Sequence, residues 1–140
     1  MAPGAIKRCI PRALAVAALV LAITAASSCR RSASEVRAEP GPGDLEQVRA
    51  EVTRLFAAAA RRDCIELATL GPQFTDPVHC EKFLTGWEER QVRLIRVEEA
   101  RVDGRDRDAV IVRARVWRSG READMLVRAE RADGAWILGL

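Results

Sequence analysis

The carboxyl-terminal part of the chain alternates apolar and polar residues with a period of two, and this pattern constrains the fold more than any other feature. Successive side chains of a β-strand point to opposite faces of a sheet, so the alternation predicts strands with one buried face. We expect four antiparallel strands, over residues 92–102, 109–118, 122–131 and 135–140. The alternation slips between Leu94 and Ile95, which predicts an irregularity in the first strand.

Two glycine-containing segments set how these strands pair. Ser119-Gly120 and Asp133-Gly134 each fit a two-residue hairpin turn. The first turn predicts that Val112 lies opposite Val127, and every directly opposed pair on that face is then apolar. Turn chemistry and hydrophobic pattern therefore predict the same register, which is what a sheet with one buried face requires.

Helical periodicity precedes the strands. Apolar residues at helical spacing follow Asp44 and predict a helix to about Arg62, with Asp44 as its cap and Gln47 completing a capping box. Shorter helices are expected over residues 63–70 and 78–87. Helices before an antiparallel sheet make an α+β domain, with the helices packed on one face of the sheet.

This order of elements resembles the cone-shaped nuclear transport factor 2-like fold, which ketosteroid isomerase-like proteins share with many small bacterial lipoproteins. The features that carry the resemblance are the helix junction at residues 57–63, the long strands and the closing Asp133-Gly134-Ala135-Trp136 turn. The resemblance covers about residues 44–140 and implies a curved four-stranded sheet, the cystatin-like cone. Because this fold hosts enzymes, binding modules and assembly subunits alike, it does not assign a function.

The amino-terminal segment has the three-part order of an export signal. Basic residues precede an apolar run over residues 13–26, which ends in small residues before Cys29. The segment predicts a signal peptide over residues 1–28 and resembles a bacterial lipoprotein precursor with Cys29 as the lipid-attachment site, although Ala26 stands where Leu is usual. The run is shorter than the about 20 residues of a membrane-spanning helix. Plain secretion is the alternative.

The predicted mature chain begins with a tether. Residues 29–43 are mostly small and polar, and they predict the lipidated cysteine and a flexible link to a single domain over residues 44–140. Arg30 stands where, by resemblance to lipoproteins of double-membraned bacteria, an acidic residue is associated with inner-membrane retention. We therefore expect the protein in the bacterial cell envelope, anchored to the outer membrane and facing the periplasm.

Cysteine usage supports the same interpretation. Removal of the signal also removes Cys9 and leaves three cysteines, so a Cys64–Cys80 disulfide would leave Cys29 for lipidation. This disulfide would tie the second helix to the third. A metal site that adds His79 is the weaker alternative, since the spacing typical of zinc ligands is missing.

The charge of the predicted mature chain argues against nucleic-acid binding. Lys7, Arg8 and Arg12 lie in the signal, and without these three the 23 basic residues become 20, equal to the 20 acidic residues. Arginine is interleaved with acidic residues, as over residues 101–108. We therefore expect no nucleic-acid partner.

Candidate catalytic residues are few. His79 is the only histidine, and Asp63 and Asp76 are explained equally well as helix caps. The chain has no tyrosine, a proton donor that ketosteroid isomerase-like sites use. We expect a non-enzymatic protein without cofactor or metal, and a ketosteroid isomerase-like isomerase or hydrolase is the alternative.

Two binding hypotheses follow from the predicted sheet. If the core is not filled, small residues beside aromatic ones leave an apolar cavity on the inner face, lined by Phe56, Trp87, Val112, Ala114, Met125, Val127, Trp136 and Leu138. Trp117, on the outer face, would instead belong to a contact surface for a protein partner. The outer face also permits a homodimer, and its charged residues are Arg113, Arg115, Arg128 and Glu130.

Overall fold

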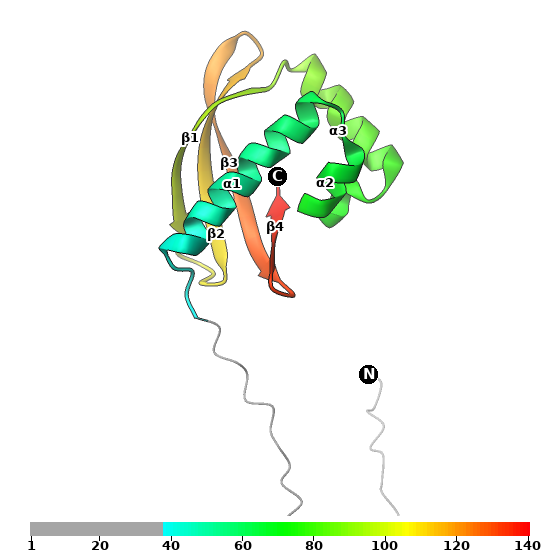
Figure 1. Cartoon of the computed structure of the whole chain (residues 1–140). Coiled ribbons are helices and arrows are strands. Elements are labelled where there is room, and N and C mark those ends of the chain that lie inside the picture. Colours follow the sequence, from blue (N-terminus) through cyan, green and yellow to red (C-terminus); the bar gives the residue numbers. More distant parts are fainter. Residues whose placement is uncertain (1–37) are drawn as a thin grey trace, which may run out of the picture. The chain divides into compact units, whose positions relative to one another are not determined.

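The computed structural model describes residues 38–140 (Figure 1). The helical part consists of α1 (Pro42–Ala60), α2 (Cys64–Leu70), the 3-10 turn η1 (Pro72–Phe74) and α3 (Pro77–Glu89). The strands are β1 (Arg93–Val102), β2 (Ala109–Arg118), β3 (Arg121–Ala132) and β4 (Ala135–Gly139). They form one antiparallel sheet in the order β1-β2-β3-β4, which confirms the predicted α+β class. The predicted signal peptide and Cys29 lie outside the described residues.

Helix α1 begins before the residue predicted to cap it. Gly41 is the N-cap and Pro42 takes the first helical position, where its fixed φ is favourable. Asp44 lies in the first turn, and its carboxylate accepts a hydrogen bond from the Gly41 backbone N–H at 2.9 Å. The predictions of Asp44 as the cap and of Gln47 in a capping box are therefore wrong, and α1 includes residues 42 and 43, which were predicted to end the tether.

The two shorter helices begin within one residue of their predicted starts. The Asp63 carboxylate accepts a hydrogen bond from the Glu66 N–H, and the Asp76 carboxylate accepts one from the Val78 N–H, each at 3.0 Å. These bonds satisfy backbone donors that the first helical turn leaves without partners.

The predicted disulfide joins these helices. Cys64 at the start of α2 is bonded to Cys80 in α3, with Cα atoms 6.0 Å apart and a sequence separation of 16 residues. Closing a loop of this length removes about 3 kcal/mol of chain entropy from the unfolded state.

Both hairpin turns have the predicted geometry. The residues of Ser119-Gly120 have φ values of 51° and 81°, and those of Asp133-Gly134 have φ values of 49° and 80°. These positive values match the strand twist in a two-residue hairpin. Val112 lies opposite Val127, so the predicted register of β2 and β3 is confirmed.

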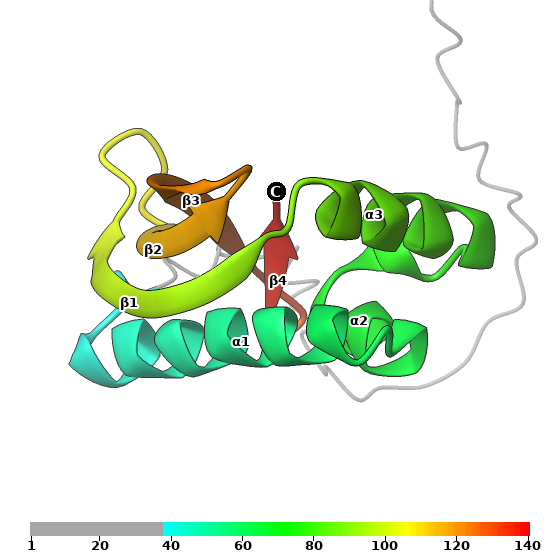
Figure 2. The ribbon, with the colours of Figure 1, turned by 90° about the horizontal axis from the view of Figure 1, so that it is seen from above.

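Strand β1 pairs with β2 through two irregularities. Ile95 is the extra residue at the predicted slip, and Glu98 is a second extra residue that the sequence pattern did not predict. Bulges bend a strand and increase its twist. Figure 2 shows β1 curving along α1, which runs across one side of the sheet.

The core lies between the helices and the inner face of the sheet. Val48, Val52 and Leu55 of α1 are fully buried, and so are alternate residues over 110–116 of β2 and residues 127 and 129 of β3. Burial of each such side chain contributes about 1.5–3 kcal/mol. An aromatic series, Phe56–Trp87–Phe83–Phe74, extends from this core into the layer of short helices, with successive ring centroids 5.2, 4.8 and 4.8 Å apart.

Candidate functional site

The eight residues predicted to line an apolar cavity are brought together in one core cluster. Seven of them are buried, whereas Met125 is only partly buried and packs against the edge of the cluster. Met125 also lines a surface hollow, together with Leu126 and Leu140. Met125 lies at the end of the sheet where β3 extends beyond β4.

Strand β4 covers only part of β3. Its residues pair with Arg128–Ala132, whereas Arg121–Val127 has β2 on one side and no strand on the other within residues 38–140. Figure 1 shows β4 ending beside β3, well short of the β2–β3 hairpin. We call Arg121–Val127 the open edge of β3, because such an edge presents backbone N–H and C=O groups without strand partners.

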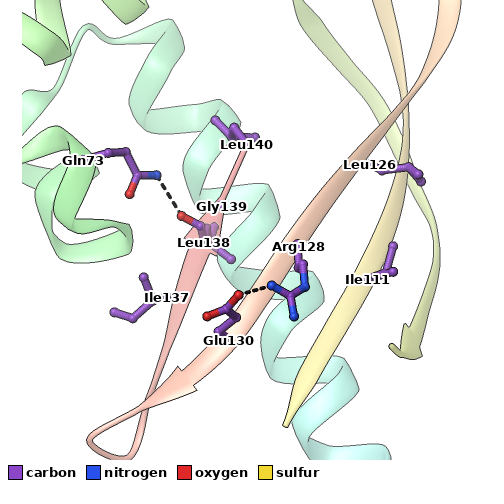
Figure 3. Close-up of a pocket in the computed structure, with 9 residues that line it drawn as sticks. All are labelled: Gln73, Ile111, Leu126, Arg128, Glu130, Ile137, Leu138, Gly139 and Leu140. Carbon is purple, nitrogen blue, oxygen red and sulfur yellow. Dashed lines mark hydrogen bonds and ion pairs between the residues drawn. The ribbon is translucent and has the colours of Figure 1, made fainter. Parts of the chain in front are cut away.

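A hollow of about 540 Å³ lies on the outer face where β4 ends (Figure 3). Its apolar lining comes from three strands, with Ile111, Leu126 and Ile137 around Gly139. Because Gly139 has no side chain, the surface is depressed at this point. The volume falls in the range of about 300–1,000 Å³ that is typical of ligand sites.

Two further hollows lie on the side of the short helices. One, of about 510 Å³, is lined by Phe74, His79, Phe83 and Leu140. The other, of about 320 Å³, is bounded by α3 and the β2–β3 hairpin. Its apolar residues are Phe83, Trp87, Val92, Met125, Leu126 and Leu140.

The three hollows share lining residues. Leu140 lines all three, and four other residues line two of them. Leu126 and Leu140 are 61% and 55% exposed, which is unusual for leucine in two adjoining positions. We call this surface the Leu140 trough and define it by the shared residues Gln73, Phe83, Leu126, Gly139 and Leu140.

The end of β4 is held to the helical layer by Gln73. Its Nε2 donates a hydrogen bond to the Leu138 carbonyl oxygen at 2.8 Å, and Figure 3 shows this bond beside the hollow. The bond joins η1 to the sheet directly before Gly139 and Leu140. The bond therefore anchors the end of β4 to the helical layer beside the trough.

Charged groups on the outer face pair with one another within the chain. Arg115 lies 3.1 Å from Asp124, and Arg128 lies 3.1 Å from Asp103 and 2.9 Å from Asp106. Hydrogen bonds from the Arg105 backbone N–H and from Arg128 hold the pKa of the Asp103 carboxyl below its ordinary value. The predicted homodimer through this face stays a prediction.

Four arginines near the hairpin end of the open edge differ from these paired charges. None of the ion pairs found within residues 38–140 includes Arg90, Arg93, Arg118 or Arg121. Arg118 lies opposite Arg121 in the hairpin, and the Ser119 N–H donates to the Arg90 carbonyl at 2.7 Å. Arg90 and Arg118 line the smallest of the three hollows, so this end of the trough attracts anions.

Trp117 lies outside the trough. It is on the outer face, opposite Arg93 and Glu122, as the predicted register requires, and it is half-buried. None of the three hollows of the trough is lined by it. Its assignment to a contact surface stays a prediction.

The residues of the enzyme hypothesis are not gathered in one place. His79 Nδ1 lies 2.7 Å from Asp76 Oδ2, and His79 lines one hollow of the trough with its side chain 72% exposed. Asp63 caps α2 and lines none of the three hollows. No group of three or more His, Cys, Asp or Glu residues could hold a metal ion in the part of the chain that the structure describes.

Sequence reasoning missed Phe83, Leu126 and Leu140 as site residues. A usable signal was present, because the predicted last strand was shorter than the strand before it. In the structure β4 has 5 residues and β3 has 12, so β3 must project beyond β4. Leu126 lies on the part of β3 that β4 does not cover, and it is exposed.

Comparison with known proteins gives no match to any family model and none to any curated protein. Among the helices over residues 38–140, none is long and apolar enough to cross a membrane. The resemblance to nuclear transport factor 2-like domains therefore stays a prediction.

Proposed function

We propose that this is a lipid-anchored, non-enzymatic protein of the bacterial cell envelope whose single domain binds a protein partner or an apolar small molecule in the Leu140 trough. The observation that carries the binding role is the contiguous apolar surface around Leu126 and Leu140. Large exposed apolar side chains in adjoining hollows are typical of binding sites. The fold that the resemblance implies commonly serves such roles.

The cellular position in this proposal comes from the sequence. A signal over residues 1–28 and lipid on Cys29 would deliver the domain to the outer membrane, with secretion as the alternative. Each buried methylene of an acyl chain contributes about 0.8 kcal/mol, so two or more chains would keep the protein at the membrane. The Cys64–Cys80 disulfide supports an oxidising compartment such as the periplasm.

Site-specific photo-crosslinking tests the binding role. A photoreactive residue at position 126 of the full chain should give a discrete adduct on intact cells, because Leu126 lines two hollows of the trough. The matched control is position 65, since Ile65 is 84% exposed and lines none of the three hollows. The adduct at 126 should disappear when Leu140→Glu is added. Equal labelling at 126 and 65 would contradict the proposal.

A ketosteroid isomerase-like isomerase or hydrolase is the second candidate, favoured by the His79–Asp76 pair beside an apolar hollow. A carboxylate that accepts the Nδ1 proton leaves the imidazole Nε2 free to act as a base. Turnover of a 3-oxo-Δ5 steroid or a nitrophenyl ester, lost in His79→Gln, would support this candidate. Activity no higher than that of denatured protein would remove it.

A further inference from the structure

We propose that the open edge of β3 receives an extended peptide segment of another protein, which adds one more strand in line with β4 and places acidic residues near Arg90, Arg118 and Arg121. This inference rests on the proposed function, because it names the class of partner that occupies the Leu140 trough. Four observations support it. They are the open edge, the hollows on both of its faces, the backbone N–H and C=O groups of that edge without strand partners, and the arginines at its hairpin end that take part in none of the ion pairs found within residues 38–140.

The open edge has the length and the polarity of a docking strand. Arg121–Val127 spans seven residues, and a strand rises about 3.3 Å per residue, so a peptide of similar length fits alongside. β4 already pairs with the neighbouring Arg128–Ala132 of β3. An added strand would continue that ladder, as in known cases of β-strand addition.

The hollows lie on both faces of this edge. Leu126 and Ile111 belong to the hollow on the outer face, whereas Phe83 and Met125 belong to the hollow beside α3. Side chains of an added strand alternate between the two faces. Apolar side chains at successive positions near Leu140 would therefore enter the outer and inner hollows in turn.

The backbone of the open edge favours a peptide over an acyl chain. A lipid tail lying along Arg121–Val127 would bury backbone N–H and C=O groups without hydrogen-bond partners, which is costly. A peptide strand would pair the same groups. The apolar hollows alone fit both ligands, so the strand edge decides between them.

The charge at the hairpin end sets the direction and composition of the peptide. A strand antiparallel to β3 and continuing β4 runs away from Leu140 towards the β2–β3 hairpin. The carboxyl-terminal residues of the peptide would lie near Arg90, Arg118 and Arg121. These three arginines take part in none of the ion pairs found within residues 38–140. Acidic residues at that end would provide the complementary charge.

A second copy of the chain fits the open edge poorly. Two-fold pairing of β3 with itself must preserve the faces of the sheet. Only an axis through Asp124 pairs all seven residues of the open edge with those of the copy, and it places Asp124 opposite its own copy. Like charges directly opposite each other destabilise a strand pair. A segment of a different protein avoids this repulsion, and we take such a segment as the occupant.

The test uses the full chain in lipid nanodiscs and the peptide acetyl-Leu-Val-Thr-Val-Thr-Glu-Glu-amide. Hydrogen exchange measured by mass spectrometry should slow at least tenfold at alternate amides of Arg121–Val127 when the peptide is bound. Two peptides N-methylated at alternate positions serve as a matched pair. The peptide whose N-methyl groups block the amides facing β3 should bind more than tenfold more weakly than the unmodified peptide. The peptide methylated at the other amides should bind as the unmodified peptide does.

Charge reversal tests the direction of the peptide. The double variant Arg118→Glu with Arg121→Glu should bind the original peptide about tenfold more weakly than the unmodified chain does. The same variant should bind a peptide with Lys in place of both Glu residues as tightly as the unmodified chain binds the original peptide. The control is Arg101→Glu with Arg107→Glu, since both of these arginines are exposed and line none of the trough hollows. This control should bind the original peptide as the unmodified chain does.

Absence of amide protection at millimolar peptide would overturn the inference. The inference would also be overturned if oleate displaced the peptide without slowing hydrogen exchange in Arg121–Val127. That result would assign the trough to a lipid. In either case an adduct at position 126 that Leu140→Glu abolishes would leave the proposed function standing. If the adduct at position 126 persisted in the Leu140→Glu variant, the proposed function itself would fail.

Discussion

The Gln73 side chain holds the Leu138 carbonyl at 2.8 Å and thereby joins the turn between the short helices to the last strand of the sheet. Gly139 and Leu140 follow directly, so this bond positions the centre of the trough. Leu126 on β3 lies across the hollow from Gln73 (Figure 3). The bond thus joins two parts of the trough that lie 65 residues apart in sequence.

Gln73→Ala should lower the free energy of unfolding by about 0.5–1.5 kcal/mol, the usual contribution of one hydrogen bond. Hydrogen exchange in β4 should increase, because the strand loses its link to η1. Chemical denaturation and exchange on the full chain measure both effects. Gln47→Ala is the control and should change stability by less than about 0.5 kcal/mol, since Gln47 is exposed and forms no capping box.

Loss of the disulfide should destabilise the domain by about 2–4 kcal/mol. Cys64→Ser with Cys80→Ser should match the reduced unmodified protein in its urea midpoint, because both lack the same cross-link. Mass spectrometry should show a gain of two hydrogens on reduction of the unmodified protein. A double variant as stable as the oxidised protein would contradict the structural role of the bond.

Leu138→Ala and Leu140→Ala should separate core from trough. Leu138 has no exposed surface, so its truncation should cost about 2–5 kcal/mol of unfolding free energy. Leu140 is 55% exposed, and its truncation should cost less than about 1 kcal/mol while weakening ligand capture. Thermal and urea unfolding measure the first effect, and crosslinking at position 126 measures the second. Equal destabilisation by the two changes would mean that Leu140 belongs to the core.

Asp103 should make stability depend on pH in the acid range. Its pKa in the folded protein lies below the ordinary value of 3.8, first because the Arg105 N–H donates to it and then because of Arg128. A lowered folded pKa gives stability that is present above the unfolded pKa and is lost as pH falls through the folded pKa. Asp103→Asn should therefore be less stable than the unmodified protein at pH 7, and the difference should shrink in acid. Urea unfolding as a function of pH measures this, and a pH-independent difference would contradict the assignment.

The strands were predictable because turn chemistry and hydrophobic alternation act locally. Ser119-Gly120 and Asp133-Gly134 determine the register of β2, β3 and β4, and this register is confirmed. The start of α1 was mispredicted, because Asp44 suits both a cap and the first turn, and only Pro42 distinguishes the two. The bulge at Glu98 breaks no apolar pattern and so left no signal.

The trough was harder to predict, because it joins residues distant in sequence. Gln73, Phe83, Leu126 and Leu140 come from η1, α3, β3 and the residue after β4. Their proximity depends on how the layer of short helices packs against the end of the sheet. Local patterns identify Leu126 and Leu140 as strand residues, but they do not show that both remain exposed.

The most direct test of the binding role is the mass of the membrane-extracted full chain under native conditions, compared with its mass after denaturation without reductant. We expect a native excess, either a few hundred daltons of an apolar molecule or the mass of a protein partner. Leu126→Glu should abolish this excess and Ile65→Glu should not, since only Leu126 lines the trough. Equal native and denatured masses for the unmodified chain, or an excess that Leu126→Glu leaves intact, would contradict binding in the trough.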